Sequence, residues 1–264
     1  MKLRRLQSTN LFVSSLGLGT VKFGRNEQVK YPGEFDLPSD DEILGLLDVA
    51  QEEGINLLDT APAYGVSEER LGRLLGPRRD DWVIVSKAGE TFVDGESKFD
   101  FSPAAITESL DRTLSRLRTD RVECLLLHSD GNDLEIINRS GALGALFALK
   151  KAGKVLSVGI STKTVEGGKR AIELGLDAVM ATYNPWNTEE GEVLDEASVT
   201  GTSIFVKKAL ASGWFGKGEE PENPVEWAFR FIYDHPATTS VIVGTINPDH
   251  LRENCAAMRR VEED

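Results

Sequence analysis

Three apolar runs in this sequence end, one after another, on side chains that can do chemistry. The first run, residues 55–58, leads into Asp59, and Tyr64 follows in a loop bounded by proline and glycine. The next two runs end on Lys87 and His128. Alone, each residue has a simple structural explanation, as a turn residue, a solvated lysine or a core histidine. Parallel barrels keep their chemistry at the carboxyl ends of their strands, so three such ends in succession predict one shared site.

Helix signals separate these runs and continue along the chain. Ser39 and Glu42 have the spacing of a capping box, and a proline directly follows Ser102, Asn223 and Asn247. Eight strands alternating with eight helices predict an α/β fold, a single (β/α)8 TIM barrel that takes up residues 1–264 as one domain. We expect the strands near residues 15–20, 55–58, 82–87, 123–128, 156–160, 178–182, 203–207 and 240–243.

The overall charge and the cysteines limit the partners. A net charge of −13 and a sequence pI near 4.8 argue against nucleic acid and against an anionic membrane surface. Cys124 and Cys255 have neither a metal-binding nor a redox spacing and suit a reducing cytosol. No stretch resembles a membrane span or a signal peptide. We therefore expect a cytoplasmic protein without metal, and a monomer.

The order of these residues resembles the aldo-keto reductase family. Asp-Thr-Ala-x-x-Tyr-Gly at residues 59–65 is followed by a strand ending in Ser-Lys and by Leu-Leu-His-Ser-Asp at residues 126–130. The likeness extends from Leu-Gly-Leu-Gly-Thr at residues 16–20 to Leu-Arg-Glu-Asn at residues 251–254. It implies an NAD(P)-dependent oxidoreductase that reduces a small-molecule carbonyl substrate, an aldehyde or ketone, reversibly to an alcohol. It also implies that a β-hairpin at residues 3–13 closes the bottom of the barrel.

The resemblance gives each reactive side chain a role. When hydride reaches a carbonyl carbon, the oxygen must be protonated. Tyr64 is then the proton donor. A free tyrosine, with a pKa of about 10, is a poor acid near neutrality, so the resemblance implies that Lys87 and Asp59 tune it. His128 orients the carbonyl oxygen and helps to relay the proton.

The expected dinucleotide site is not a Rossmann site, because no Gly-x-Gly-x-x-Gly follows a strand. In the family that this sequence resembles, the cofactor instead lies across the carboxyl-terminal face of the barrel. The cofactor-binding residues implied by resemblance are Gly19, Thr20, Ser161, Thr162, Lys207, Lys208, Leu210, Ser212, Gly244, Thr245, His250, Glu253 and Asn254.

Several positions depart from the family pattern. Met180 stands where glutamine is usual, and Lys207 replaces the aromatic ring that normally stacks on the nicotinamide. Lys207 and Lys208 either hold a diphosphate or end a strand in solvent. Gly244 and His250 stand where lysine and arginine often hold the 2′-phosphate, which is the clamp that separates phosphate from hydroxyl. We expect NADP(H) as the cofactor, with NAD(H) as a close alternative.

The substrate pocket is less defined by the sequence. Lys22, Trp186 and Trp214 follow strands and are candidates to line it. The chain stops soon after Asn254, where the family often has a longer tail over the substrate, so we expect an open pocket on that side.

Two other functions remain open. The altered nicotinamide site is compatible with a nucleotide-binding regulatory barrel that turns over slowly. A Schiff-base lyase with Lys87 as nucleophile is a third possibility, since barrels host such lysines.

Overall fold

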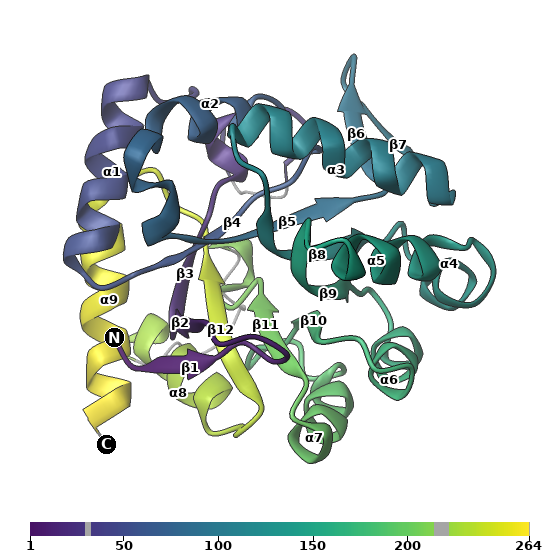
Figure 1. Cartoon of the computed structure of the whole chain (residues 1–264). Helices are drawn as coiled ribbons and strands as arrows, with labels where there is room; N and C mark the ends of the chain where they lie inside the picture. Colours follow the sequence, from purple (N-terminus) through teal and green to yellow (C-terminus); the bar gives the residue numbers. More distant parts are fainter. Residues whose placement is uncertain (30–32, 214–221, 264) are drawn as a thin grey trace.

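Parallel strands close into a barrel in the computed structural model, which describes residues 1–29, 33–213 and 222–263 (Figure 1). Around this barrel the order is β3-β4-β5-β8-β9-β10-β11-β12, and β12 pairs with β3 to complete the circle. The predicted eight-stranded barrel is thus confirmed. Its strands are β3 (Leu16–Gly19), β4 (Leu57–Asp59), β5 (Val83–Ala88), β8 (Val122–His128), β9 (Val155–Ser161), β10 (Ala178–Thr182), β11 (Ser203–Lys207) and β12 (Thr238–Val243).

Helices surround the barrel, and one of those in the described residues was not predicted. Two helices, α4 and α5, follow β8 where the sequence pattern indicated one. Helix α4 has seven residues, which is too short for a helical period to emerge from the sequence. No helix in the described part of the chain is long and apolar enough to cross a membrane. The α-helices are α1 (Asp40–Glu52), α2 (Ser67–Leu74), α3 (Pro103–Leu117), α4 (Asp133–Arg139), α5 (Ala142–Lys151), α6 (Val165–Glu173), α7 (Gly191–Thr200), α8 (Pro224–Tyr233) and α9 (Pro248–Glu263), with short 3-10 helices η1 (Val21–Phe23), η2 (Gly76–Asp81) and η3 (Ala211–Gly213).

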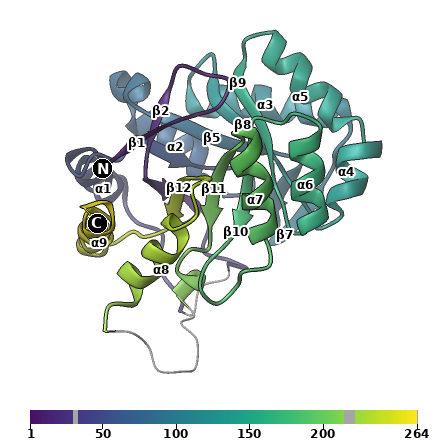
Figure 2. The same cartoon turned by 90° about the horizontal axis from the view of Figure 1, so that it is seen from below.

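The predicted hairpin of β1 (Leu3–Arg5) and β2 (Phe12–Ser14) lies at the amino-terminal end of the barrel (Figure 2). Leu6 and Val13 are fully buried in one cluster with inward-facing side chains such as Phe205. The Gln7 backbone N–H donates to the Ser203 hydroxyl at the first residue of β11. The hairpin therefore fills the end of the barrel opposite the reactive side chains.

A second hairpin, of β6 (Glu90–Val93) and β7 (Glu96–Phe99), was not predicted and projects beside α3 (Figure 1). Its turn is Asp94-Gly95, and both residues have positive φ angles, 53° and 78°. An Asp-Gly pair between alternating residues is a strong hairpin signal, because two-residue turns of this kind need positive φ. The sequence therefore did carry the information, and the hairpin brings Glu90 to the barrel mouth.

Two glycines position the loop that carries Tyr64. Gly65 has a φ of +60°, and the backbone there packs directly on Gly24 at the end of η1. A Cβ on Gly24 would lie 2.2 Å from the Ser67 nitrogen and 2.4 Å from the Tyr64 carbonyl oxygen. Both contacts are with backbone, which cannot rotate away as a side chain can. Only glycine at position 24 allows this approach.

We predict that Gly24→Ala lowers the free energy of unfolding by about 1–3 kcal/mol, the usual cost of overpacking. Gly45→Ala, on the exposed side of α1, is the matched control, because no atom lies within 4 Å of its new Cβ. That control should gain up to about 1 kcal/mol from helix propensity. Denaturant unfolding measures both, and equal effects of the two alanines would contradict the packing described.

Candidate active site

A cavity of about 1170 Å³ opens at the carboxyl-terminal mouth of the barrel. All four side chains predicted to react line it. Asp59 and His128 are the last residues of β4 and β8, Lys87 is next to last in β5, and Tyr64 lies in the loop after β4. Strands β4, β5 and β8 are neighbours in the barrel. Strand order alone therefore gathers residues that are far apart in the sequence.

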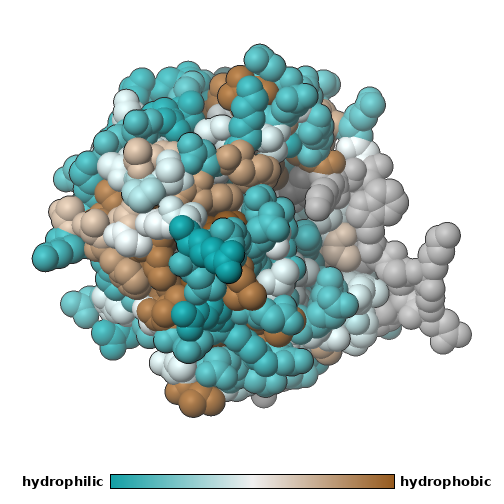
Figure 3. All heavy atoms as spheres, turned by 90° about the vertical axis from the view of Figure 1, so that its right-hand side faces the viewer, coloured by the Kyte–Doolittle hydropathy of each residue, from teal (hydrophilic) through white to brown (hydrophobic). Residues whose placement is uncertain are grey.

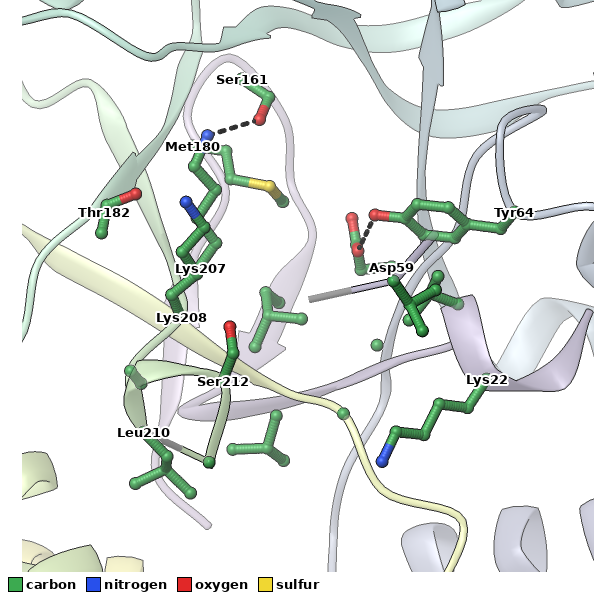
Figure 4. Close-up of a pocket in the computed structure, with 18 of the residues that line it drawn as sticks. Lys22, Asp59, Tyr64, Ser161, Met180, Thr182, Lys207, Lys208, Leu210 and Ser212 are labelled. Atoms are coloured by element: carbon green, nitrogen blue, oxygen red, sulfur yellow. Dashed lines mark hydrogen bonds between the residues drawn. The ribbon is translucent and has the colours of Figure 1, made fainter. Parts of the chain in front are cut away.

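Lys87 is at the centre of this group. Its Nζ atom lies 2.5 Å from Asp59 Oδ1, 3.0 Å from the Tyr64 hydroxyl and 3.0 Å from the Thr60 carbonyl oxygen. The Tyr64 hydroxyl also donates to Asp59 Oδ2 at 3.3 Å, a bond drawn in Figure 4. The Lys87 ammonium thus has three oxygen partners and directs one of its protons at the phenol oxygen.

This ion pair is almost completely removed from water. The Lys87 side chain is 1% exposed and the Asp59 side chain 6%. Taking two charges out of water costs several kcal/mol, which their attraction offsets only when the geometry is good. The short contact and the additional oxygen partners of Lys87 provide that geometry.

His128 lies beside Tyr64 and has a carboxylate partner of its own. The two rings meet edge to face, with centroids 6.3 Å apart. His128 Nδ1 is 2.7 Å from Glu90 Oε2. Burial lowers the pKa of His128, and Glu90 opposes that shift. Burial acts to raise the pKa of Glu90, but the His128 ring and the Ser97 hydroxyl outweigh it and bring it to about 2. The sequence analysis did not find Glu90.

Lys207 faces this group across the cavity (Figure 4). It is the last residue of β11, and its Nζ donates to the Ser161 hydroxyl at 2.9 Å and to the Thr162 carbonyl oxygen at 2.5 Å. Burial lowers the pKa of Lys207 to about 8, although Glu190 acts in the opposite direction. The ammonium of Lys207 therefore contacts the serine that was expected to meet the nicotinamide carboxamide.

Glu190 is a second residue that the sequence analysis missed. Its carboxylate is 6% exposed, accepts the Thr162 hydroxyl at 2.8 Å and accepts the Thr182 backbone N–H at 2.6 Å. It thereby ties the end of β10 to the residue that follows β9. No motif marks it, because its role depends on the strand order.

The far end of the cavity is formed by residues after β12. The Asn247 side chain accepts the backbone N–H groups of Asp249 and His250, and so caps the start of α9. Thr245 accepts the Asn247 N–H at 3.0 Å. His250 is exposed on the cavity wall, one turn from Asn254. The start of a helix favours anions, so this end suits a phosphate group.

The structure brings most of the predicted cofactor residues together. Of the predicted set, the cavity wall includes Gly19, Ser161, Thr162, Lys207, Lys208, Leu210, Ser212, Gly244, Thr245, His250, Glu253 and Asn254.

The other predicted residues are Thr20 and the three candidates for the substrate pocket. Thr20 lies off the wall and donates its hydroxyl to the Asp59 carbonyl oxygen, which supports the site from behind. Among the substrate candidates, Lys22 extends into the cavity (Figure 4), whereas Trp186 lies off its wall and packs edge to face on Trp227. Trp214 lies outside the described residues.

A barrel with a buried Asp59–Lys87 pair, a half-buried tyrosine beside it and a histidine at its mouth has the groups for acid–base chemistry, and the comparisons with known proteins identify the family. The sequence model described as the aldo/keto reductase family matches residues 15–227. The chain therefore belongs to the aldo/keto reductase family, whose members act on small-molecule carbonyl compounds, and it is an NAD(P)-dependent oxidoreductase.

Solved and characterised relatives agree with this. A structure from Pseudomonas aeruginosa assigned to the aldo-keto reductases is 48% identical, with a TM-score of 0.88 over 98% of this chain and 94% of that one. An aldo-keto reductase from Bacillus halodurans in its holo form is 26% identical, with a TM-score of 0.82 over 98% and 91%. D-threo-aldose 1-dehydrogenase from a Pseudomonas species is 29% identical over 80% of this chain and 70% of its own length.

We predict that breaking the buried pair from either side destabilises the fold strongly. Asp59→Asn or Lys87→Met should each cost about 3 kcal/mol or more, because each leaves one charge buried without a partner. The double variant should lose clearly less than the sum of the two, and denaturant unfolding measures this. Asp111→Asn removes the partner of Lys154 in an exposed pair and should change little. Strictly additive losses at positions 59 and 87 would contradict the pair.

Proposed function

We propose that this protein reduces an aldehyde or ketone to an alcohol, reversibly, with hydride from a nicotinamide and a proton from Tyr64. The observation that supports this best is the Tyr64 hydroxyl, held 3.0 Å from the Lys87 ammonium at the wall of a large cavity. A proton donor must lie within hydrogen-bond reach of a substrate bound in the cavity, and its anion must be stabilised after the proton has left. Tyr64 meets both conditions.

The surrounding residues explain how Tyr64 would work. Lys87 can stabilise the phenolate that remains after the proton leaves, because one of its protons already points at that oxygen. Asp59 holds Lys87 in place and keeps the buried ammonium compensated. His128, whose ring meets the Tyr64 ring edge to face at the cavity wall, would contact the carbonyl oxygen and orient it. A Schiff-base role for Lys87 is disfavoured by this arrangement, since its ammonium is fully engaged and buried.

The cavity fits a dinucleotide together with a small carbonyl compound. Its volume of about 1170 Å³ exceeds the range of about 300–1,000 Å³ that is usual for ligand pockets. When bound, a nicotinamide supplies the hydride. Ser161 and Lys207 would meet the nicotinamide end, and the residues from Gly244 to Asn254 the adenosine end. Lys207 then belongs beside the ring and not on the diphosphate, because its ammonium is bound at Ser161.

We propose NADP(H) as the preferred form, with NAD(H) as the alternative. The start of α9 provides N–H groups and a positive helix end for a 2′-phosphate, and His250 is exposed beside it. An imidazole cannot offer the two parallel N–H groups of a guanidinium to a phosphate, so the expected preference is weaker than an arginine would give.

A second candidate function is a nucleotide-binding barrel with a regulatory role. The contact between Lys207 and Ser161 favours it, because the ammonium takes up a hydrogen-bonding position that a carboxamide would need. The complete Asp59, Lys87, Tyr64 and His128 arrangement favours catalysis, which we rank first.

For the molecule as a whole we propose one catalytic domain over residues 1–264, working as a monomer in the cytoplasm. On the face shown in Figure 3, hydrophilic side chains surround smaller apolar areas. Both cysteines are buried, and burial raises the pKa of each thiol to about 12, so neither is reactive.

We predict that Tyr64→Phe leaves cofactor affinity nearly unchanged and lowers turnover by about 100-fold or more, as loss of a general acid does. Fluorescence titration and steady oxidation of NADPH with an aromatic aldehyde measure the two quantities. Turnover equal to that of wild type would remove Tyr64 from this role.

We also predict that His250→Arg raises the preference for NADPH over NADH by about 10-fold, the effect of one better charged hydrogen bond. Paired titrations with the two cofactors test this. If the Arg variant leaves their ratio unmoved, His250 does not contact the 2′-phosphate.

A further inference from the structure

His128 has a carboxylate partner, Glu90, that has no role in the reduction proposed above. Glu90 Oε2 lies 2.7 Å from His128 Nδ1, an ion-pair contact that is not aligned as a hydrogen bond, and Nδ1 is buried while part of the ring is open to the cavity. The Glu90 side chain is only 11% exposed. Its other oxygen accepts the Ser97 hydroxyl at 2.6 Å from across the β6–β7 hairpin. Glu90 is therefore fixed from both sides.

The backbone places Glu90 at this point by a turn that only glycine makes easily. Ala88 in β5 pairs with Leu127 in β8, so the next residues on the two strands, Gly89 and His128, lie side by side. Gly89 has a φ of +100°, and a Cβ there would lie 2.3 Å from the Phe101 ring. The chain thus leaves β5 with a sharp turn that directs Glu90 to His128.

The charges around His128 come from several elements. Glu90 on β6 favours a proton on the ring, whereas Lys87 on β5 and Lys207 on β11 disfavour it. The Tyr64 ring covers another side, and Asp59 is already paired with Lys87. Glu90 itself faces the Arg25 guanidinium as well as His128. Among these partners in the described residues, Glu90 is the carboxylate in contact with the imidazole.

We propose that Glu90 is a positioning residue that keeps a proton on Nδ1 of His128, so that the ring can donate to a carbonyl oxygen only when it is doubly protonated. The reason is the lone pair. An unprotonated Nδ1 only 2.7 Å from a carboxylate oxygen would be repelled by it, so the neutral ring carries its proton on Nδ1 and leaves Nε2 as an acceptor. An acceptor repels a carbonyl oxygen, and a second proton on Nε2 turns it into a donor.

This assignment rests on the proposed carbonyl reduction and adds a pH dependence to it. The kcat/KM for reduction should fall as the pH rises through the ionisation of His128. Burial and two lysines lower the pKa of the His128 ring, and Glu90 makes that decrease smaller. In Glu90→Gln the amide oxygen can still accept the Nδ1 proton, so the neutral ring keeps Nε2 as an acceptor. The loss of the negative charge makes the doubly protonated ring rarer at every pH above its ionisation.

Glu90→Gln in the full-length protein tests this, with Glu96→Gln as the matched control. Glu96 lies on the same hairpin, is exposed and loses the same charge. In proteins with ¹⁵N-labelled histidine, ring nitrogen shifts report which nitrogen carries the proton, and a His128→Gln sample identifies the signals. We expect Nδ1–H in the neutral wild-type ring. Glu90→Gln should reduce the doubly protonated fraction about 10-fold at a given pH, and the control should leave it unchanged.

The pH profile of aldehyde reduction supplies the second readout. At neutral pH, Glu90→Gln should lower kcat/KM about 10-fold, and the rates of the two proteins should converge as the pH falls and both rings become doubly protonated. A merely structural role would lower the rate equally at all pH values. Such a constant loss, a neutral ring with its proton on Nε2, or coincident titrations in Glu90→Gln and wild type would each overturn the proposal. The NMR result needs no substrate, so it stands apart from a failure of the proposed reductase activity.

Discussion

The buried ion pair between Lys87 and Asp59 is the interaction on which the barrel mouth depends. It links the ends of β4 and β5, and it fixes the ammonium that holds the Tyr64 hydroxyl. A pair this deeply buried is a poor way to gain stability, because desolvation offsets most of the attraction. The proposed reaction explains its presence better, since Tyr64 as the proposed proton donor needs a positive charge fixed beside it. The backbone contact between Gly24 and Gly65 holds the loop that carries Tyr64 from outside the barrel.

This centre could be predicted from the sequence because the order of the parallel strands brings together residues that are distant in the chain. Asp59, Lys87 and His128 each close an apolar run, and parallel strands bring such ends to one face. The positions of Glu90 and Glu190 could not be predicted in this way. Each is placed by a turn and by the register of neighbouring strands, and each matters through a partner far away in sequence. The Asp94-Gly95 turn signal was available and would have located the hairpin, although not its contact with His128.

At the expected cofactor end of the site, the family pattern does not predict how the side chains are arranged. Lys207 stands where a stacking ring is expected, and only the structure reveals its bonds to Ser161 and Thr162. Trp186 follows a strand as pocket residues do, yet it turns away and packs on Trp227. A side chain's position in the sequence predicts which end of the barrel it occupies. Whether it points into the cavity is decided by packing with neighbours that the sequence does not identify.

We propose that the pair of Lys87 and Asp59 prepares this mouth for direct hydride transfer to a carbonyl carbon. Mass spectrometry of the alcohol formed from an aromatic aldehyde and cofactor deuterated at the transferable position tests it most directly. We expect one deuterium on the carbinol carbon for the wild-type protein. Lys87→Met should bind the cofactor and yield far less product in the same time. Alcohol without deuterium would contradict direct hydride transfer, and equal yield from both proteins would contradict the role of Lys87.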